Sequence, residues 1–274
     1  MKLEHLERAF ESIGARLRVG TPAPLTRGFR SVTTAYSLDI GHDREGQFFA
    51  LRGDDAALAA VEISLLNKQA DDRHLLILVK NEDGTRKDRF LCGHDEREWF
   101  VAAVPGTAST VVQAKEALKP APVRQAQARK GLNARKANTR HNAAFRRQGE
   151  WFFLPVERPL TVDPKLILRN EPLSRGAGSK PHLVEQIYRT GGEVVYVSRK
   201  HPRGITQVQY NKLIKHNEAA RSMAWQQLRR NPAVYARGAV RHPDHETIVL
   251  HDWCRVLMNE EHQAPARQNL AFLD

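Results

Sequence analysis

The sequence contains little cysteine and no long apolar segment. Only Cys92 and Cys254 carry thiols among 274 residues, and each lies in a short apolar run. Disulfide-dense secreted domains usually carry more cysteines, so we expect two reduced, buried thiols. No apolar run approaches the roughly 20 residues of a membrane-spanning helix. The charged stretch 1–14 is also not typical of a signal peptide. We therefore expect a cytoplasmic protein with no membrane partner.

Acidic residues are absent from one segment of the chain. The whole sequence has 43 Lys and Arg residues against 31 Asp and Glu, a formal charge of +12. Residues 119–149 hold nine cations and no acid, whereas residues 1–118 hold 16 cations and 18 acids. Excess positive charge of this kind favours a polyanionic partner, and the segment lacks the bulky apolar face of a membrane-surface helix. The sequence therefore predicts a nucleic-acid interface.

Well-known functional motifs are also missing. We find no helix-turn-helix, RNA-recognition or C₂H₂ zinc-finger signature, no GxxxxGK[ST] loop and no HExxH. ATP hydrolysis is therefore not expected. Because no groove-reading helix signature is found, the sequence favours RNA slightly over DNA as the partner. These absences leave open whether the protein is an enzyme.

The pattern of apolar residues predicts an α+β protein of two domains, each a mostly antiparallel sheet with flanking helices. The N-terminal domain is expected over residues 1–118 and the C-terminal domain over residues 150–274. A basic, alanine-rich connector over residues 119–149 joins them. It shows no apolar face wide enough to bury, so we expect it to be mobile without a partner.

Several elements can be placed within these domains. Apolar residues at helical spacing predict a helix over residues 2–18. Two apolar runs joined by Asp83 and Gly84 predict a β-hairpin. In the second half, HLVEQIYRT (182–190) indicates one or two helical turns, and residues 212–231 predict a longer helix.

The cations expected to contact phosphates fall in two groups. Each phosphate contact releases counterions, so several together give strong binding without any base reading. The first group lies in the connector: Arg129, Lys130, Arg135, Lys136, Arg140, Arg146 and Arg147. The second lies in loops and hairpin tips of the C-terminal half: Lys180, Lys200, Arg203 and Arg241. A solvated linker with no partner is the simpler alternative for the connector.

Histidines are concentrated in the C-terminal half. The stretch RHPDHETIVLHDW contains His242, His245 and His251, and His182 and His201 lie in nearby loops or tips. Imidazole and carboxylate groups suit zinc, manganese or iron. No recognised ligand spacing is present, so exposed surface histidines are the simpler alternative, and we expect no cofactor other than a divalent ion, zinc or manganese, at these residues. A metal with an open position would activate water, with Glu185 or Asp252 as the base. The alternative function is therefore a metal-dependent hydrolase, most plausibly a nuclease.

Two further patterns have simpler explanations. The stretch FLCGHDEREWF places His94 beside four charged residues, but a hydrophilic turn between two strands explains it. LSRGAGSKPH offers glycines and cations for phosphate binding without completing a nucleotide-binding motif.

The near-neutral N-terminal domain is expected to contact a protein partner or a second copy of the chain. An assembly protein whose connector binds an acidic protein is a third possibility.

Overall fold

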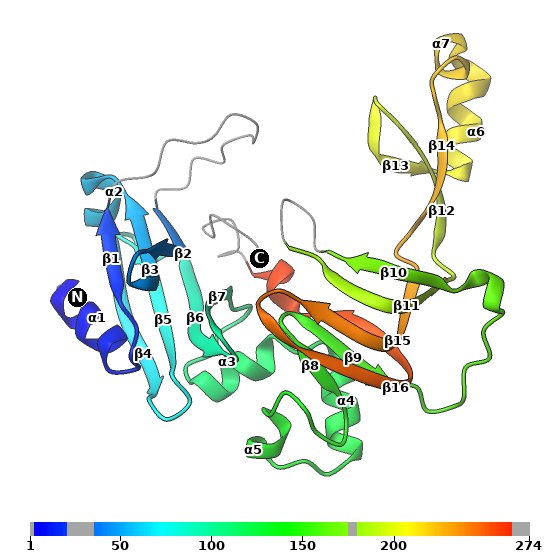
Figure 1. The fold of residues 1–274 in the computed structure, drawn as a ribbon. Coiled ribbons are helices and arrows are strands. Elements are labelled where there is room, and N and C mark those ends of the chain that lie inside the picture. Colours follow the sequence, from blue (N-terminus) through cyan, green and yellow to red (C-terminus); the bar gives the residue numbers. More distant parts are fainter. Residues whose placement is uncertain (1–2, 21–35, 175–179, 265–274) are drawn as a thin grey trace.

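Mostly antiparallel sheets and a few short helices form the fold, which Figure 1 shows. It is a computed structural model that describes residues 3–20, 36–174 and 180–264. The expectation of mostly antiparallel sheets with flanking helices is confirmed. The division into two domains with a connector stays a prediction. Cys92 and Cys254 are both buried and unpaired, as expected.

The N-terminal half holds two sheets, in the orders β1-β3-β2 and β4-β5-β6-β7. Its elements are α1 (Leu3–Glu11), β1 (Leu17–Gly20), β2 (Tyr36–Asp43), β3 (Gly46–Gly53), α2 (Asp55–Ala59), β4 (Val61–Gln69), β5 (His74–Asn81), β6 (Lys87–Asp95), β7 (Glu98–Ala103) and α3 (Val111–Ala117). Phe10, Phe49 and Phe90 are fully buried where α1 and the two sheets meet. Helix α3 packs on the other side of the second sheet, against Leu76 and Leu91. The predicted hairpin is confirmed as β5 and β6.

The connector is folded, so the expectation of a mobile segment was wrong. It forms α4 (Ala121–Arg129), α5 (Ala134–Ala137) and β8 (Arg146–Gln148). Val123 and Ala126 of α4 pack with the buried Phe145 and with Phe152 of the following strand. Small apolar side chains are enough here because two phenylalanines fill the space beside them.

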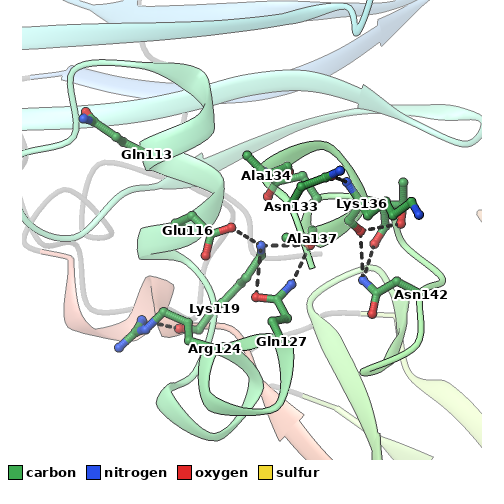
Figure 2. A network of polar contacts seen from close by, with 12 residues as sticks. Gln113, Glu116, Lys119, Arg124, Gln127, Asn133, Ala134, Lys136, Ala137 and Asn142 are labelled. Atoms are coloured by element: carbon green, nitrogen blue, oxygen red, sulfur yellow. Dashed lines mark hydrogen bonds and ion pairs between the residues drawn. The ribbon is translucent and has the colours of Figure 1, made fainter. Parts of the chain in front are cut away.

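A buried lysine also ties the connector together (Figure 2). Lys119 is only 4% exposed and forms an ion pair with Glu116 of α3. Its ammonium group donates to the Ala137 carbonyl at 2.9 Å, and the Gln127 amide donates to the same oxygen at 2.5 Å. This network fastens α5 to the helices before it.

The C-terminal half is built on a six-stranded sheet in the order β10-β11-β15-β16-β9-β8. Phe153, Ile187 and Val240 are fully buried in its core. Besides β8, the sheet contains β9 (Trp151–Pro155), β10 (Leu168–Leu173), β11 (His182–Thr190), β15 (Ala233–His242) and β16 (His245–Met258). Two short 3₁₀ helices, η1 (Pro164–Leu166) and η2 (Glu260–Gln263), precede β10 and follow β16. The helical turns predicted over residues 182–190 are wrong, because this segment is strand β11 paired with both β10 and β15.

A small basic unit stands out from the large sheet, in yellow in Figure 1, and we call residues 193–230 the arm. It comprises β12 (Glu193–Ser198), β13 (His201–Thr206), α6 (Gln207–His216), α7 (Glu218–Arg221) and β14 (Gln226–Arg230). Its strands pair in the order β13-β12-β14. The single helix predicted over residues 212–231 is therefore wrong, since two helices and a strand occupy that range. No helix within the described ranges is long and apolar enough to cross a bilayer.

His74 gives the N-terminal half a defined dependence on pH. The residue is 9% exposed, and its side chain packs edge-on against Phe100 and donates from Nδ1 to the Asp72 carbonyl. Burial lowers the pKa of His74 from 6.5 to about 4. The folded state therefore holds a neutral imidazole, and its contribution to stability is complete above pH 6.5. That contribution is lost as the pH falls from 6.5 towards 4, because the unfolded chain takes up the proton first.

We expect His74→Asn to remove this dependence. Its amide can still donate to Asp72, but it does not titrate. Between pH 7 and pH 5 the free energy of unfolding should fall by about 2 kcal/mol more in the natural protein than in the variant. Urea unfolding at both pH values measures the difference. Equal losses in the two proteins would contradict the assignment.

Candidate metal centre

Three histidines from separate parts of the C-terminal sheet meet at one end of it. His182 begins β11, while His242 ends β15 and His245 begins β16. One ring nitrogen from each lies within 4.8 Å of the others. The ring centroids of His182 lie 4.2 Å from His242 and 5.6 Å from His245. We call these residues the histidine cluster. His182 is almost fully buried, whereas His242 and His245 are half-buried.

The local sequence explains how two of these histidines come together. His242 and His245 pair across the end of the β15–β16 hairpin, which leaves Pro243 and Asp244 at the centre of the turn. Proline at the first central position suits a type I turn. The Asp244 N–H donates to His242 Nδ1 at 3.2 Å and closes the turn. His182 joins them because β11 pairs alongside β15, with Leu183 opposite Arg241.

Gly149 lies directly beside two of the imidazole rings. A Cβ atom at this position would be 3.0 Å from His245 Nε2 and 3.2 Å from His182 Nε2. Both Nε2 atoms therefore lie beside the position that a Cβ atom would occupy. The φ angle of Gly149 is +55°, a conformation that also favours glycine. The neighbouring Gln148 is buried and donates to the Glu246 carbonyl at 2.6 Å, which fixes Gly149 against the hairpin.

Acidic residues of the N-terminal half reach the cluster from the β6–β7 turn. A carboxylate oxygen of Glu96 lies 3.6 Å from His245 Nδ1 and accepts the Glu246 N–H at 2.6 Å. Arg140 forms ion pairs with Glu96 and with Asp95, at 3.2 Å for Asp95. Arg147 pairs with Asp95 at 3.0 Å. Although burial acts to raise it, the pKa of Asp95 is lowered by Arg147 and Arg140.

The protonation state of His245 suits metal binding. Burial lowers its pKa to about 4, and the neighbouring His242 acts in the same direction. The ring is therefore neutral near pH 7 and has one lone pair to offer. With Glu96 on the Nδ1 side, Nε2 is the nitrogen left for a ligand. A carboxylate behind a histidine is the usual way in which proteins orient imidazole ligands.

His242 is held by other contacts. Its Nε2 lies 3.3 Å from the Lys180 carbonyl, and Nδ1 accepts the Asp244 N–H. The Lys180 ammonium forms an ion pair with Asp244 at 2.7 Å. A metal at the cluster must therefore replace one contact of His242. Ligand nitrogens around tetrahedral zinc are roughly 3.3 Å apart, so small rotations of the rings are also required.

The cluster opens onto a cleft of about 810 Å³. His242, Asp244 and His245 line one side of it. The β6–β7 turn and the connector also line the cleft, with Asp95, Glu96, Glu98, Lys119, Arg135, Arg140 and Arg147. A substrate in this cleft would meet groups of both charges next to the histidines.

The structure places the other predicted metal ligands elsewhere. His201 begins β13 in the arm and stacks on Trp225, with ring centroids 5.3 Å apart. His251 is exposed in the middle of β16. Glu185, a predicted base, accepts the Ala239 N–H at 2.9 Å from its place in β11. Asp252 is exposed in β16. Three of the five predicted histidines therefore form the cluster.

The predicted phosphate-binding cations divide into two classes. Arg129 pairs with Glu157 at 2.9 Å, Arg140 and Arg147 pair with Asp95, and Arg146 donates to the Val249 carbonyl. Six other cations are exposed, and their side chains form no hydrogen bond or ion pair within the described ranges: Lys130, Arg135, Lys136, Lys200, Arg203 and Arg241. Lys180 is exposed but paired with Asp244, and residues 175–179 of its loop lie outside the described residues. The acid-free connector is thus partly neutralised within the chain.

Sequence reasoning missed two parts of this site. Glu96 belongs to a stretch whose pattern indicated only a hydrophilic turn, and 149 residues separate it from His245. Nothing in the sequence pattern around Gly149, which follows the basic connector residues, indicated that it would lie beside the histidines. No family model, curated protein or solved structure matches this chain.

Proposed function

We propose that the protein is a metal-dependent hydrolase that cleaves the phosphodiester bonds of nucleic acid, with its metal at the histidine cluster. The convergence of His182, His242 and His245 beside the cleft carries this proposal. Three protein ligands with one side open are typical of catalytic zinc sites, whereas structural zinc sites are closed. The ligands are all imidazoles, which favours zinc over manganese and excludes a magnesium-type oxygen site.

The surrounding residues have distinct roles in this proposal. A divalent ion supplies a Lewis acid and lowers the pKa of water at its open position. Glu96 lies 3.6 Å from His245 Nδ1 and would orient the ring if the two atoms closed to hydrogen-bonding distance, and Arg140 pairs with that carboxylate. Gly149 avoids the close contact that a Cβ atom would make with two Nε2 atoms. Lys130, Arg135 and Lys136 are exposed cations close in sequence to the cleft-lining Arg140, and they suit a phosphate backbone.

Nucleic acid is favoured as the substrate by charge. The chain carries +12 overall, and unpaired exposed cations lie in both the connector and the C-terminal half. Binding of nucleic acid without cleavage, with RNA slightly favoured, would use the same cations and is the second candidate. A protein partner for the N-terminal sheets stays a prediction, and so does a cytoplasmic location.

Metal analysis combined with a cleavage assay tests the proposed function. We expect about one zinc per chain after purification. We also expect cleavage of labelled DNA or RNA that stops on treatment with a chelator and returns with added zinc or manganese. Retention of polynucleotide by a protein that neither holds metal nor cleaves after metal addition would refute the hydrolase and support the binding protein. A protein that ignores both nucleic acids at low salt would refute both.

A further inference from the structure

We propose that the arm, residues 193–230, binds duplex DNA by placing helix α6 in the major groove. This inference names the substrate of the proposed hydrolase and rests on it in that respect. The arm stands out from the large sheet, so one side of α6 faces away from the rest of the chain (Figure 1). None of the ten residues of α6 is buried. A solvated helix on a projecting unit is shaped to enter a groove.

The charge of the arm fits a polyanion. Residues 193–230 contain eight Lys and Arg residues but only two acids, Glu193 and Glu218. Glu193 is already paired with Arg230. The exposed cations Arg199, Lys200 and Arg203 lie at and beside the β12–β13 turn, and Lys212 and Lys215 lie on α6. Cations on both a turn and a helix can contact phosphates on either side of a groove.

The exposed stripe of α6 carries the residue types that read bases. Val208, Asn211, Lys212 and Lys215 follow one another at spacings of three, one and three residues, which places them on one face of the helix. Val208 is 77% exposed and is available for an apolar contact. Asparagine pairs with adenine through two hydrogen bonds in the major groove, and an apolar group contacts the thymine methyl. Lysines at the same face suit the flanking phosphates.

The arm is rigid enough to present this face. Tyr196 of β12 stacks on Tyr210 of α6 with ring centroids 3.9 Å apart. Tyr210 also meets Trp225 edge-on, and the Trp225 N–H donates to the Ala220 carbonyl at 2.8 Å. A capping box between Thr206 and Gln209 fixes the first turn of α6. These contacts anchor the inner side of the helix and leave its outer side to a ligand.

The side chain of Asn211 is oriented by a hydrogen bond from Gln207, one turn earlier in α6. Gln207 donates to the Asn211 side-chain oxygen at 2.9 Å, and the Tyr196 hydroxyl contacts the same Gln207 side chain. These contacts connect Asn211, the proposed base-reading residue, to strand β12 through Gln207 and Tyr196. The major groove of B-form DNA, about 12 Å wide, admits an α-helix. The major groove of A-form RNA is too narrow for one, so entry of α6 into a major groove requires DNA.

Binding by the full chain carrying His245→Ala tests the inference, because this background prevents cleavage and needs no metal. Fluorescence anisotropy would compare one duplex DNA pool with duplex RNA of the same sequences over a range of salt concentrations. Log affinity falls as log salt concentration rises, and adding Lys212→Gln and Lys215→Gln should make this slope shallower by about two units. At 0.1 M salt the affinity for DNA should fall on the order of sixtyfold.

The matched control replaces two exposed lysines of the N-terminal sheet, Lys68→Gln and Lys87→Gln. It removes the same charge and should leave binding nearly unchanged. Asn211→Ala should reduce the preference among DNA sequences without changing the salt slope. Equal effects of the two lysine pairs, or duplex RNA or single strands binding as tightly as duplex DNA, would overturn the inference. An inactive histidine cluster would not affect this result, so the two proposals can fail separately.

Discussion

Gly149→Ala is expected to lower the affinity of the protein for zinc by about a hundredfold. The added methyl group would lie 3.0 Å from His245 Nε2 and 3.2 Å from His182 Nε2, on the side from which a metal must approach. Changes beside metal ligands typically cost ten- to a hundredfold in affinity, and this change touches two ligands at once. Competition with a chromophoric zinc chelator measures the loss.

Gly131→Ala is the matched control for backbone strain. Gly131 has a φ of +59°, close to the +55° of Gly149, and open space surrounds its Cβ position. Both substitutions cost about 1 to 2 kcal/mol of stability through the left-handed backbone. Only Gly149→Ala should affect zinc. His245→Ala removes one proposed ligand and serves as the reference for complete loss of zinc binding at the histidine cluster. Equal zinc affinity in the two alanine variants would mean that the cluster does not bind metal through these nitrogens.

Lys119→Met is expected to destabilise the protein by about 2 to 3 kcal/mol. Methionine keeps most of the side-chain volume but removes the ammonium group that binds Glu116, Gln127 and the Ala137 carbonyl. Burial lowers the pKa of Lys119, which indicates the cost of placing this charge inside. Removing one member of such a network leaves its partners poorly satisfied.

Lys130→Met is the control for the Lys119 substitution. Lys130 is exposed one residue beyond α4, so its replacement should change the free energy of unfolding by less than about 0.5 kcal/mol. Urea unfolding measures both variants. A Lys119→Met protein as stable as the natural one would show that apolar packing replaces the network fully, and that the cluster around Phe145 and Phe152 is enough to hold the connector.

Local patterns in the sequence predicted the elements whose contacts are also local. The hairpin of β5 and β6 carries an Asp-Gly turn between two apolar runs, and it is confirmed. The error over residues 182–190 has a physical cause. A bulge between Val184 and Gln186 shifts the alternation of β11, so the buried Val184 and Ile187 lie three residues apart and imitate a helix.

The candidate site depends on contacts between distant parts of the chain, which composition and spacing do not encode. The proximity of His242 and His245 could be predicted from the sequence because only a two-residue turn separates them. It could not select His182 over His201 as the third member, since that choice follows from β11 pairing with β15. The acid-free connector suggested unpaired charge, but Asp95 and Glu96 lie opposite Arg140 and Arg147 only after folding.

Strand β15 sets the distance between the arm and the histidine cluster. Strand β14 ends at Arg230, and after Asn231 and Pro232 the ten residues of β15 lead directly to His242. Ten extended residues span about 33 Å. Base pairs in DNA are stacked about 3.4 Å apart, so this length corresponds to roughly one turn of the double helix. This length fixes only the base of the arm relative to the histidine cluster, because α6 lies beyond β12 and β14 at the outer end of the arm (Figure 1).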